Sequence, residues 1–597
     1  MAIQATDYAQ GVKWNLGDLY PEPHDPSFHQ DLDKSLKQAQ DFQKKYKEIN
    51  LATLSPQDFL VALQEYESIT ENSLKPLLYA SLLFAEDTQN DLYKNLRQKA
   101  LEKWNEIENL LLFFRLAIIH LPEDKCHFFL SYEPLQEYAH ALQHWRRFRE
   151  FTLPEKEEYI INCKNLSGKT ALATLFDEFT SSFTFRMSID GEEKELTGSE
   201  MLALLYSPDR EMRERAYRTF LNKHKDHQLV LTSIFNALFL DSHLEDGIRG
   251  YQSPMQRTHL ENEISPEIVS LMMEITENSY PLAQEYFRLK AALLGLPKLK
   301  NTDIYAPLPG GDKKISFDQA RDLLVQALQD FYPPFGEIAA KFFAQKWIDA
   351  EIRRGKYGGA FCSGLTPSLH PYLLLNFTGS IRDVLTLAHE IGHGLHFYLA
   401  RQQKFLNFDP PLILAETASV FCEMIMTQTL LKTESDKLFR RALLCLEIED
   451  IIATIFRQNV LTRFEEQIYR KRQDHLLSAE EIGELWWQAN AALFGESVEM
   501  IPEYRWGWSY ISHFVHSRFY CYSYVFGELV VLALYQKYLE AGEVFLPKLQ
   551  KLLASGGSKS PEELLLILGI NIREPFFWEG GCKIIHNLIQ ELKQVSS

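Results

Sequence analysis

The sequence has few cysteines and no pattern that pairs them. Seven are spread over 597 residues, and no two of them stand in a Cys-x-x-Cys arrangement. An odd number of scattered cysteines is typical of reduced thiols in a reducing compartment. The missing pairs also argue against a zinc site built from cysteines. We therefore expect a cytoplasmic protein.

Long apolar runs are also missing. The best one, residues 529–535, is far shorter than the roughly 20 residues that a membrane-spanning helix needs. The first ten residues lack the basic start and apolar stretch of a signal peptide. We expect no membrane partner.

Basic residues are fewer than acidic ones. Lys and Arg number 62 against 81 Asp and Glu, which gives a net charge of −19. Phosphate backbones are bound by clustered Lys and Arg, so this balance argues against a nucleic-acid partner. Hydrophobic residues make up 46% and charged residues 24%, the profile of a folded protein. Its length points to more than one lobe.

Most of the chain has the periodicity of amphipathic helices. Residues 55–114 repeat apolar side chains at three- and four-residue spacing, and long alternating stretches are rare. Two short apolar runs, 360–362 and 372–377, lie among glycines and predict short strands directly before a helix. We expect a mainly α protein with a small β-sheet beside that helix. We divide the chain into an N-terminal helical domain, 1–200, and a catalytic metallopeptidase domain, 201–597.

The helix expected after the second strand carries the sequence His389-Glu390-Ile391-Gly392-His393. Histidines four residues apart project from the same helix face and can occupy neighbouring corners of a zinc tetrahedron. Glu390 is turned away from direct ligation, and we expect it to take a proton from the attacking water.

A zinc enzyme of this type needs a third protein ligand. An almost wholly apolar helix expected after Pro411 carries Glu416 and Glu423, seven residues apart on one face. A buried carboxylate requires a cation or strong donors, and zinc is the cation expected for Glu416. For Glu423 two interpretations stay open: it orients a ligand histidine, or it forms an ordinary salt bridge to Arg or Lys.

With these two motifs in place, the chain resembles the M3 family of zinc oligopeptidases, and within it the oligoendopeptidase F branch. Segments 14–20, 196–199, 207–216, 355–363 and 371–379 extend the resemblance over nearly the full length. It implies a helical two-lobed body with a deep central channel and one Zn²⁺ per chain on the channel floor. Such a channel would admit short, flexible oligopeptides and exclude folded proteins.

The family also implies catalytic residues near the C-terminus. Taken alone, the segment 513–524 is a stretch dense in Tyr and His that fits an aromatic stripe in a core. Family members have a His and a downstream Tyr facing the zinc, where neutral donors stabilise an oxyanion. The spacing matches His513 and Tyr524, with Tyr520 as a second candidate. The branch usually has Pro where this chain has Arg518.

Five residues are candidate substrate contacts. The small residues Gly358, Gly359 and Ala360, followed by Phe361, are expected to present a free strand edge to a peptide backbone. His516 is the fifth candidate.

We predict a zinc metalloendopeptidase that hydrolyses internal bonds of short oligopeptides with a metal-activated water and Glu390 as general base. The nearer alternative is a zinc metallocarboxypeptidase, which trims a free C-terminus. The alternative from another class is a non-catalytic peptide-binding protein whose zinc braces the fold. The sequence leaves the oligomeric state and the cleavage preference open.

Overall fold

The computed structural model describes residues 8–189, 191–310 and 313–596. It is 71% helical with only small sheets, which confirms the prediction of a mainly α fold. Within the described residues, no helix is both long and apolar enough to cross a membrane. Residues 1–7, part of the segment in which we expected no signal peptide, lie outside the described residues.

By its internal contacts the chain divides into two compact units, and each is assembled from three separate stretches. Unit 1 consists of Met1–Glu155, Lys313–Leu430 and Tyr538–Ile570. Unit 2 consists of Lys156–Asp312, Leu431–Lys537 and Asn571–Ser597. The deep channel and the division at residue 200 stay predictions.

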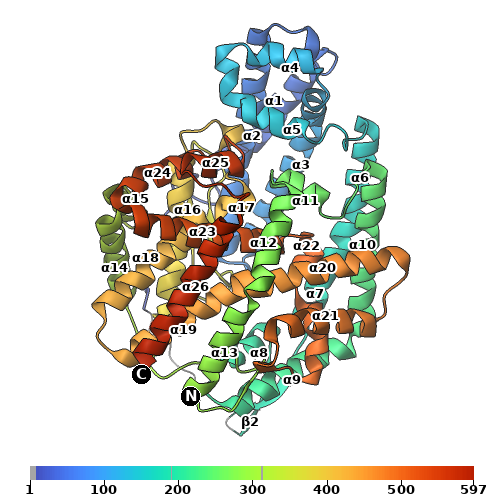
Figure 1. Cartoon of the computed structure of the whole chain (residues 1–597). Coiled ribbons are helices and arrows are strands. Elements are labelled where there is room, and N and C mark those ends of the chain that lie inside the picture. Colours follow the sequence, from blue (N-terminus) through green and yellow to red (C-terminus); the bar gives the residue numbers. More distant parts are fainter. Residues whose placement is uncertain (1–7, 190, 311–312, 597) are drawn as a thin grey trace. The chain divides into compact units, whose positions relative to one another are not determined.

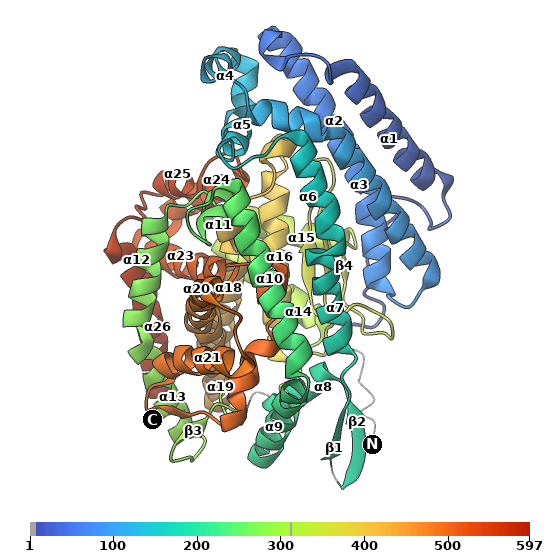
Figure 2. The same cartoon turned by 90° about the vertical axis from the view of Figure 1, so that its right-hand side faces the viewer.

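Unit 1 begins with long helices that stand side by side (Figures 1 and 2). The elements of this unit are α1 (Pro26–Tyr46), η1 (Leu51–Thr53), α2 (Pro56–Glu86), α3 (Asp91–Ile119), α4 (Glu123–Leu130), η2 (Glu133–Tyr138), α5 (Ala139–Arg146), α14 (Phe317–Phe331), α15 (Pro333–Ala344), β4 (Ile348–Asp349), β5 (Phe361–Ser363), β6 (Tyr372–Leu374), α16 (Ile381–Ala400), η4 (Phe405–Asn407), α17 (Leu412–Ala415), η7 (Gly542–Phe545), α24 (Leu546–Ala554) and α25 (Pro561–Ile567). Helices α1, α2 and α3 share a core of buried aromatic rings that includes Phe42, Tyr66 and Phe114. The periodicity of residues 55–114 is therefore the buried face of α2 and α3.

The small sheet of unit 1 lies against helix α16. Its strand order is β4-β6-β5, with β6 parallel to β4 and antiparallel to β5. The register pairs Phe361 with Leu374, and α16 packs on both β5 and β6. The existence of both strands and their place beside the motif helix are confirmed. Strand β5 begins one residue later than predicted, and β6 ends at Leu374, three residues before the predicted end. The ring of Trp14 packs on Phe361 and Tyr372, which gives the N-terminal motif a structural role.

Unit 2 is also helical and contains two further small sheets. Its elements are α6 (Glu155–Ser167), α7 (Lys169–Ser181), β1 (Phe185–Ile189), β2 (Glu192–Leu196), α8 (Gly198–Ala203), η3 (Leu204–Tyr206), α9 (Arg210–Asp226), α10 (Gln228–Arg249), α11 (Gln256–Glu261), α12 (Pro266–Asn278), α13 (Tyr280–Leu293), β3 (Leu299–Lys300), α19 (Lys437–Ile452), η5 (Ala453–Arg457), α20 (Gln458–Asp474), α21 (Ala479–Phe494), β7 (Val498–Glu499), η6 (Pro502–Tyr510), α22 (His513–His516) and α26 (Pro575–Ser596). Strands β1 and β2 form an antiparallel pair, and β3 is parallel to β7. Helix α18 (Thr417–Thr433) begins in unit 1 and ends in unit 2, and α23 (Cys521–Ala541) begins in unit 2 and ends in unit 1.

A buried ion cluster accounts for the charged motif at residues 207–216. The carboxylate of Asp303 is fully buried and accepts hydrogen bonds from Arg210 at 2.7 Å and from Arg213 at 2.8 Å. Removing one partner of such a cluster would leave a buried charge uncompensated, which is strongly destabilising. The motif therefore holds α9 against the segment after β3.

Candidate active site

Helix α16 positions the two histidines of the motif. Ser380 caps the helix by accepting a hydrogen bond from the Asp383 amide, and Asp383 reciprocates in a capping box. The start of the helix agrees with the prediction from these two residues. One turn of helix then separates His389 from His393, and their Nε2 atoms lie 3.1 Å apart.

Glu416 meets both histidines at the junction of α17 and α18. Its Oε2 atom lies 3.4 Å from Nε2 of His389 and 3.3 Å from Nε2 of His393. The hydroxyl of Ser419 donates a 2.7 Å hydrogen bond to the same oxygen. The pattern predicted one continuous apolar helix here, whereas the structure ends α17 at Ala415 and begins α18 at Thr417. Glu416 thus lies between two helices, where Ser419 orients its carboxylate.

Glu423 contacts His389 from the opposite side of the ring. Its Oε1 atom lies 3.3 Å from Nδ1 of His389. Of the two interpretations left open by the sequence, this geometry favours the orienting contact over a salt bridge to Arg or Lys. A carboxylate on Nδ1 fixes the ring and leaves Nε2 directed at Glu416.

The electrostatics of the cluster are those of imidazoles held among carboxylates. Burial alone would lower the pKa of His389, but the negative charges of Glu423 and Glu416 outweigh it and raise the pKa to about 10. Burial would likewise raise the pKa of Glu416, but the hydrogen bond and charge of His393 lower it to about 2. The carboxylates therefore stabilise positive charge at this point of the fold.

The donor set fits a divalent zinc ion. Ligand atoms of His389, His393 and Glu416 all lie within 4.8 Å of one another. Zinc bonds of about 2.0–2.1 Å in a tetrahedron place neighbouring ligand atoms roughly 3.3 Å apart. The observed separations of 3.1, 3.4 and 3.3 Å match that geometry. Two imidazoles and one carboxylate are also the donor types found at catalytic zinc sites, which keep a fourth position for water.

Glu390 lies beside these residues but outside the ligand cluster. Its side chain is 5% exposed, and its Oε2 atom is buried with no hydrogen-bond partner among the described residues. Burial raises the pKa of this carboxyl. A buried carboxylate with a free oxygen and a raised pKa is suited to accept and release a proton.

The C-terminal candidates form a cluster of their own in unit 2. Nε2 of His513 lies 3.4 Å from the hydroxyl of Tyr524, and the ring of His513 stacks on Tyr520 with centroids 5.8 Å apart. Burial, and after it the charge of Arg457, lowers the pKa of His513, which favours the neutral form of its imidazole. His516 differs from the others because its Nε2 pairs with Asp177 at 2.9 Å on an exposed surface.

Arg518 has a structural partner that explains the departure from the family pattern. Its guanidinium makes a bidentate ion pair with Asp246, at 2.8 and 2.6 Å. The next residue, Phe519, has a positive φ of 52°, and its amide donates a 2.9 Å hydrogen bond to Glu465. These contacts hold the turn between His513 and Tyr524.

Four of the five candidate substrate residues lie in unit 1: Gly358, Gly359 and Ala360 directly precede strand β5, and Phe361 begins it. Strand β5 is an outer strand, paired on one side with β6. A Cβ atom added to Gly358 or Gly359 would meet no atom within 4 Å, and Gly359 has a φ of 96°. The amide of Asn376 donates hydrogen bonds of 3.0 Å to the carbonyls of Tyr357 and Gly359, which shapes the turn before Ala360 and Phe361.

Gly392, inside the motif, has a role at this site that its sequence position alone did not predict. A Cβ atom at this position would lie 2.4 Å from the carbonyl oxygen of Ala418 and 2.4 Å from Cα of Ser419. Helix α16 therefore crosses the start of α18 at backbone contact, and that crossing brings both histidines to Glu416. The available signal was a glycine inside the motif of a helix, where glycine is otherwise unfavourable.

Comparisons with known proteins agree with this fold. The sequence profile of peptidase family M3 matches residues 203–583, and that of oligopeptidase F matches residues 118–185. Oligopeptidase PepF of Bacillus subtilis is 25% identical over 588 residues, which cover 98% of this chain and 87% of the relative. The crystal structure of a peptidase from Chlamydophila abortus matches with a TM-score of 0.84 at 24% identity, and the match covers 98% of both chains. Oligoendopeptidase-F from Enterococcus faecium has a TM-score of 0.72 at 22% identity, covering 95% of this chain and 98% of that one.

Fold, site and matches together define a metallo-oligopeptidase. The M3 profile covers more than half of the chain. The protein belongs to peptidase family M3, as its motifs predicted.

Proposed function

We propose that this metallo-oligopeptidase is a zinc endopeptidase that cuts internal bonds of short oligopeptides, with one Zn²⁺ held by His389, His393 and Glu416. The observation that carries the proposal is the convergence of these three ligand atoms within 4.8 Å, at separations that suit one tetrahedral ion. The relatives named as oligoendopeptidases support the substrate class.

Held by His389, His393 and Glu416, zinc would serve as a Lewis acid, which polarises a carbonyl and lowers the pKa of water to about 7. Glu390 takes the proton from the attacking water at its unpartnered Oε2 and passes it to the leaving amine. Its raised pKa brings the carboxyl closer to neutral pH, which suits both transfers. Glu423 holds His389 in the orientation that ligation needs.

His513 and Tyr524 are proposed to stabilise the oxyanion, with Tyr520 as the second phenol. Their support is chemical: the lowered pKa of His513 favours the neutral imidazole, and a neutral imidazole beside a phenol, 3.4 Å apart, is the kind of donor pair that stabilises an oxyanion. The open edge of β5, together with the turn at Gly359 that precedes it, is proposed to pair with the peptide backbone. His516 is a weaker candidate for substrate contact because Asp177 occupies its imidazole.

The test of this function is an assay with a peptide of about ten residues, blocked at both ends and internally quenched, which is long enough to extend through a peptide-binding cleft. We expect cleavage that a chelator abolishes and added zinc restores. Cleavage of only an unblocked peptide, one residue at a time, would replace the endopeptidase by the carboxypeptidase. Tight zinc binding without cleavage of either peptide would favour the non-catalytic alternative.

Replacing Glu423 by Gln should weaken zinc binding by about 10–100-fold, the usual effect of losing a carboxylate behind a ligand histidine. The amide keeps the size of the side chain and loses the charge that stabilises the His389 ring. Zinc affinity is measured by competition with a chromogenic chelator. Glu480→Gln, the same change at an exposed position, is the matched control. Equal affinities in the two variants would remove Glu423 from the site.

The cytoplasmic location and the two-domain division are further parts of the proposal. All seven cysteines of the chain are free thiols, as expected of a protein in a reducing compartment. The division at residue 200 is supported by the M3 profile, whose match begins at residue 203. The acidic net charge of −19 supports the absence of a nucleic-acid partner.

A further inference from the structure

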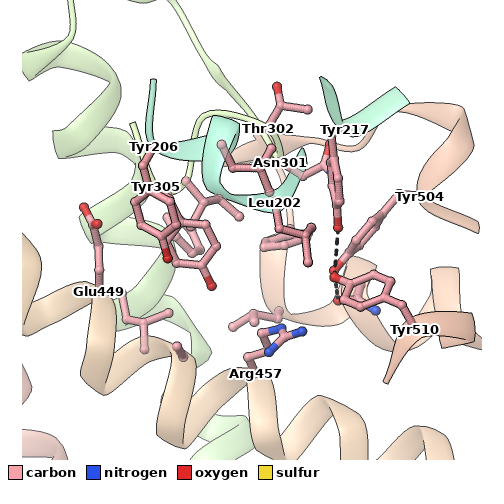
Figure 3. A pocket seen from close by; sticks show the side chains of 18 residues that line it. Leu202, Tyr206, Tyr217, Asn301, Thr302, Tyr305, Glu449, Arg457, Tyr504 and Tyr510 are labelled. Carbon is pink, nitrogen blue, oxygen red and sulfur yellow. Dashed lines mark hydrogen bonds between the residues drawn. The ribbon is translucent and has the colours of Figure 1, made fainter. Parts of the chain in front are cut away.

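Unit 2 contains a cavity that the proposed mechanism does not use. Its volume is about 210 Å³, and its wall comes from segments far apart in the sequence, including η3, α9, the 301–305 loop and η6 (Figure 3). Pockets for drug-sized ligands measure roughly 300–1,000 Å³, so this cavity suits one chemical group of a larger ligand. Apolar side chains such as Leu205 and Phe287 complete the wall.

Arg457 brings an uncompensated positive charge to this cavity. It ends η5, a π-helical turn between α19 and α20, and such turns are frequent at functional sites. None of the carboxylates that the structure describes forms an ion pair with it. The acidic residue in the wall, Glu449, is already paired with the buried Lys290 and accepts a hydrogen bond from Tyr286. A guanidinium is always protonated and is stabilised by an anion, and none of the described carboxylates is paired with Arg457.

Buried hydrogen-bond donors without partners line the same cavity. Asn301 is 7% exposed, and its Oδ1 accepts a 3.0 Å hydrogen bond from the amide of Ile501, which fixes the orientation of the side chain. Its Nδ2 group then has no partner within the described part of the chain, and the same holds for Oγ1 of the buried Thr302. An unsatisfied buried donor is unfavourable, and an acceptor on a ligand would remove that penalty.

Phenol groups add further donors. Burial raises the pKa of Tyr305 to about 12, so its hydroxyl keeps its proton. Tyr217 and Tyr510 share one 3.1 Å hydrogen bond, which leaves one of the two protons to donate elsewhere. Figure 3 shows Tyr217, Tyr504 and Tyr510 gathered on one side of the cavity beside Arg457, with Tyr305 on the other. The lining is therefore rich in donors around a single fixed cation.

We propose that this cavity binds a carboxylate of the peptide substrate, with Arg457 as its ionic partner and Asn301 and Tyr305 as hydrogen-bond donors. The proposal rests on the proposed function for the identity of the ligand as a peptide. Arg457 is close enough to His513 for its charge to lower the pKa of that imidazole, so the cavity neighbours a residue assigned to the reaction. Anchoring a C-terminal carboxylate here would favour peptides with a free C-terminus.

The test measures binding separately from cleavage, so that it stands even if the protein proves not to cut peptides. Three N-acetylated hexapeptides of Ala and Leu are titrated by calorimetry into the Glu390→Gln protein: a free acid, a C-terminal amide, and an amide with one internal Asp. We expect the free acid to bind about tenfold or more tightly than the plain amide, as for a charge-assisted contact. Equal affinity of the Asp-containing amide and the free acid would assign the site to acidic side chains rather than the C-terminus.

Substitutions then identify the residues responsible for the preference for a carboxylate over an amide. Adding Arg457→Met should abolish the difference between carboxylate and amide without weakening the amide, and Tyr305→Phe should reduce it several-fold. Arg463→Met removes the same charge from α20 at an ion pair with Glu277 and should leave the preference intact. Equal binding of all three peptides, or a preference that survives Arg457→Met, would overturn the proposal.

Thermal unfolding distinguishes ligand binding from a structural role. Arg457→Met removes a charge that has no counter-ion, so the unfolding temperature should stay equal or rise. A large drop would mean that Arg457 holds the fold together, and Tyr305→Phe would then decide the ligand question alone: an unchanged carboxylate preference in that variant would overturn the proposal.

Discussion

Glu390→Gln should retain its zinc and lose peptidase activity by roughly 10²–10⁴-fold, the contribution of a general base. The amide has nearly the same shape as the carboxylate but cannot accept the proton of the attacking water. Since burial raises the pKa of Glu390, the substitution also removes a desolvated charge, and the protein should be at least as stable. The measurements are kcat/KM on the blocked peptide, metal content and thermal unfolding.

Loss of activity with full metal content and unchanged stability is the combination that identifies a general base. A metal ligand would lose zinc together with activity, and a structural residue would lose stability. Glu480→Gln controls for the loss of one negative charge at an exposed position. Activity within a few-fold of the unmodified enzyme, in a variant with full metal content, would transfer the role of base to another group.

The local part of the site was predictable because it depends on helix geometry alone. His389 and His393 share a face in any α-helix, and the Ser380 cap fixes where that helix begins. Glu416 could be found because a carboxylate in an apolar segment must meet a cation or donors. The strands before α16 were likewise visible as short apolar runs between glycines. Each of these predictions required only neighbouring residues.

The rest of the fold and of the site depends on contacts between segments far apart in the chain, and a single sequence does not reveal which segments meet. The break at Glu416 was missed because the apolar pattern continues through it, whereas the contact with both histidines fixes that residue between α17 and α18. The cavity around Arg457 gathers residues from Leu202 to Tyr510. Its unpartnered donors at Asn301 and Thr302 are visible only after folding, because any polar residue in a sequence is a possible surface residue.

The crossing of α16 and α18 is the tertiary contact on which the metal site depends. At Gly392 the obstacle to a side chain is the backbone of Ala418 and Ser419, which cannot move away as a flexible side chain can. A Cβ atom added to Gly394, two residues on, would lie 2.6 Å from Cζ of Phe342, and a side chain can shift where a backbone cannot. Substituting the two glycines therefore compares a clash with backbone, at Gly392, with a clash with a side chain, at Gly394, on the same helix.

Gly392→Ala should lower the free energy of unfolding by about 1–3 kcal/mol or more, the range for overpacking a tight core contact. It should also reduce activity by about 100-fold, because separating α16 from α18 by even 1 Å displaces both histidines from Glu416. Gly394→Ala should have a smaller effect on both quantities.

Gly247→Ala is the control for helix propensity. A Cβ atom at this position of α10 would meet no atom within 4 Å, so the change should stabilise the protein by about 0.5–1 kcal/mol. The measurements are denaturant unfolding, zinc affinity and kcat/KM. If Gly392→Ala kept full zinc affinity and activity, the close crossing would not be what holds the ligands together, and the interaction of Glu416 with Ser419 would have to position the carboxylate by itself.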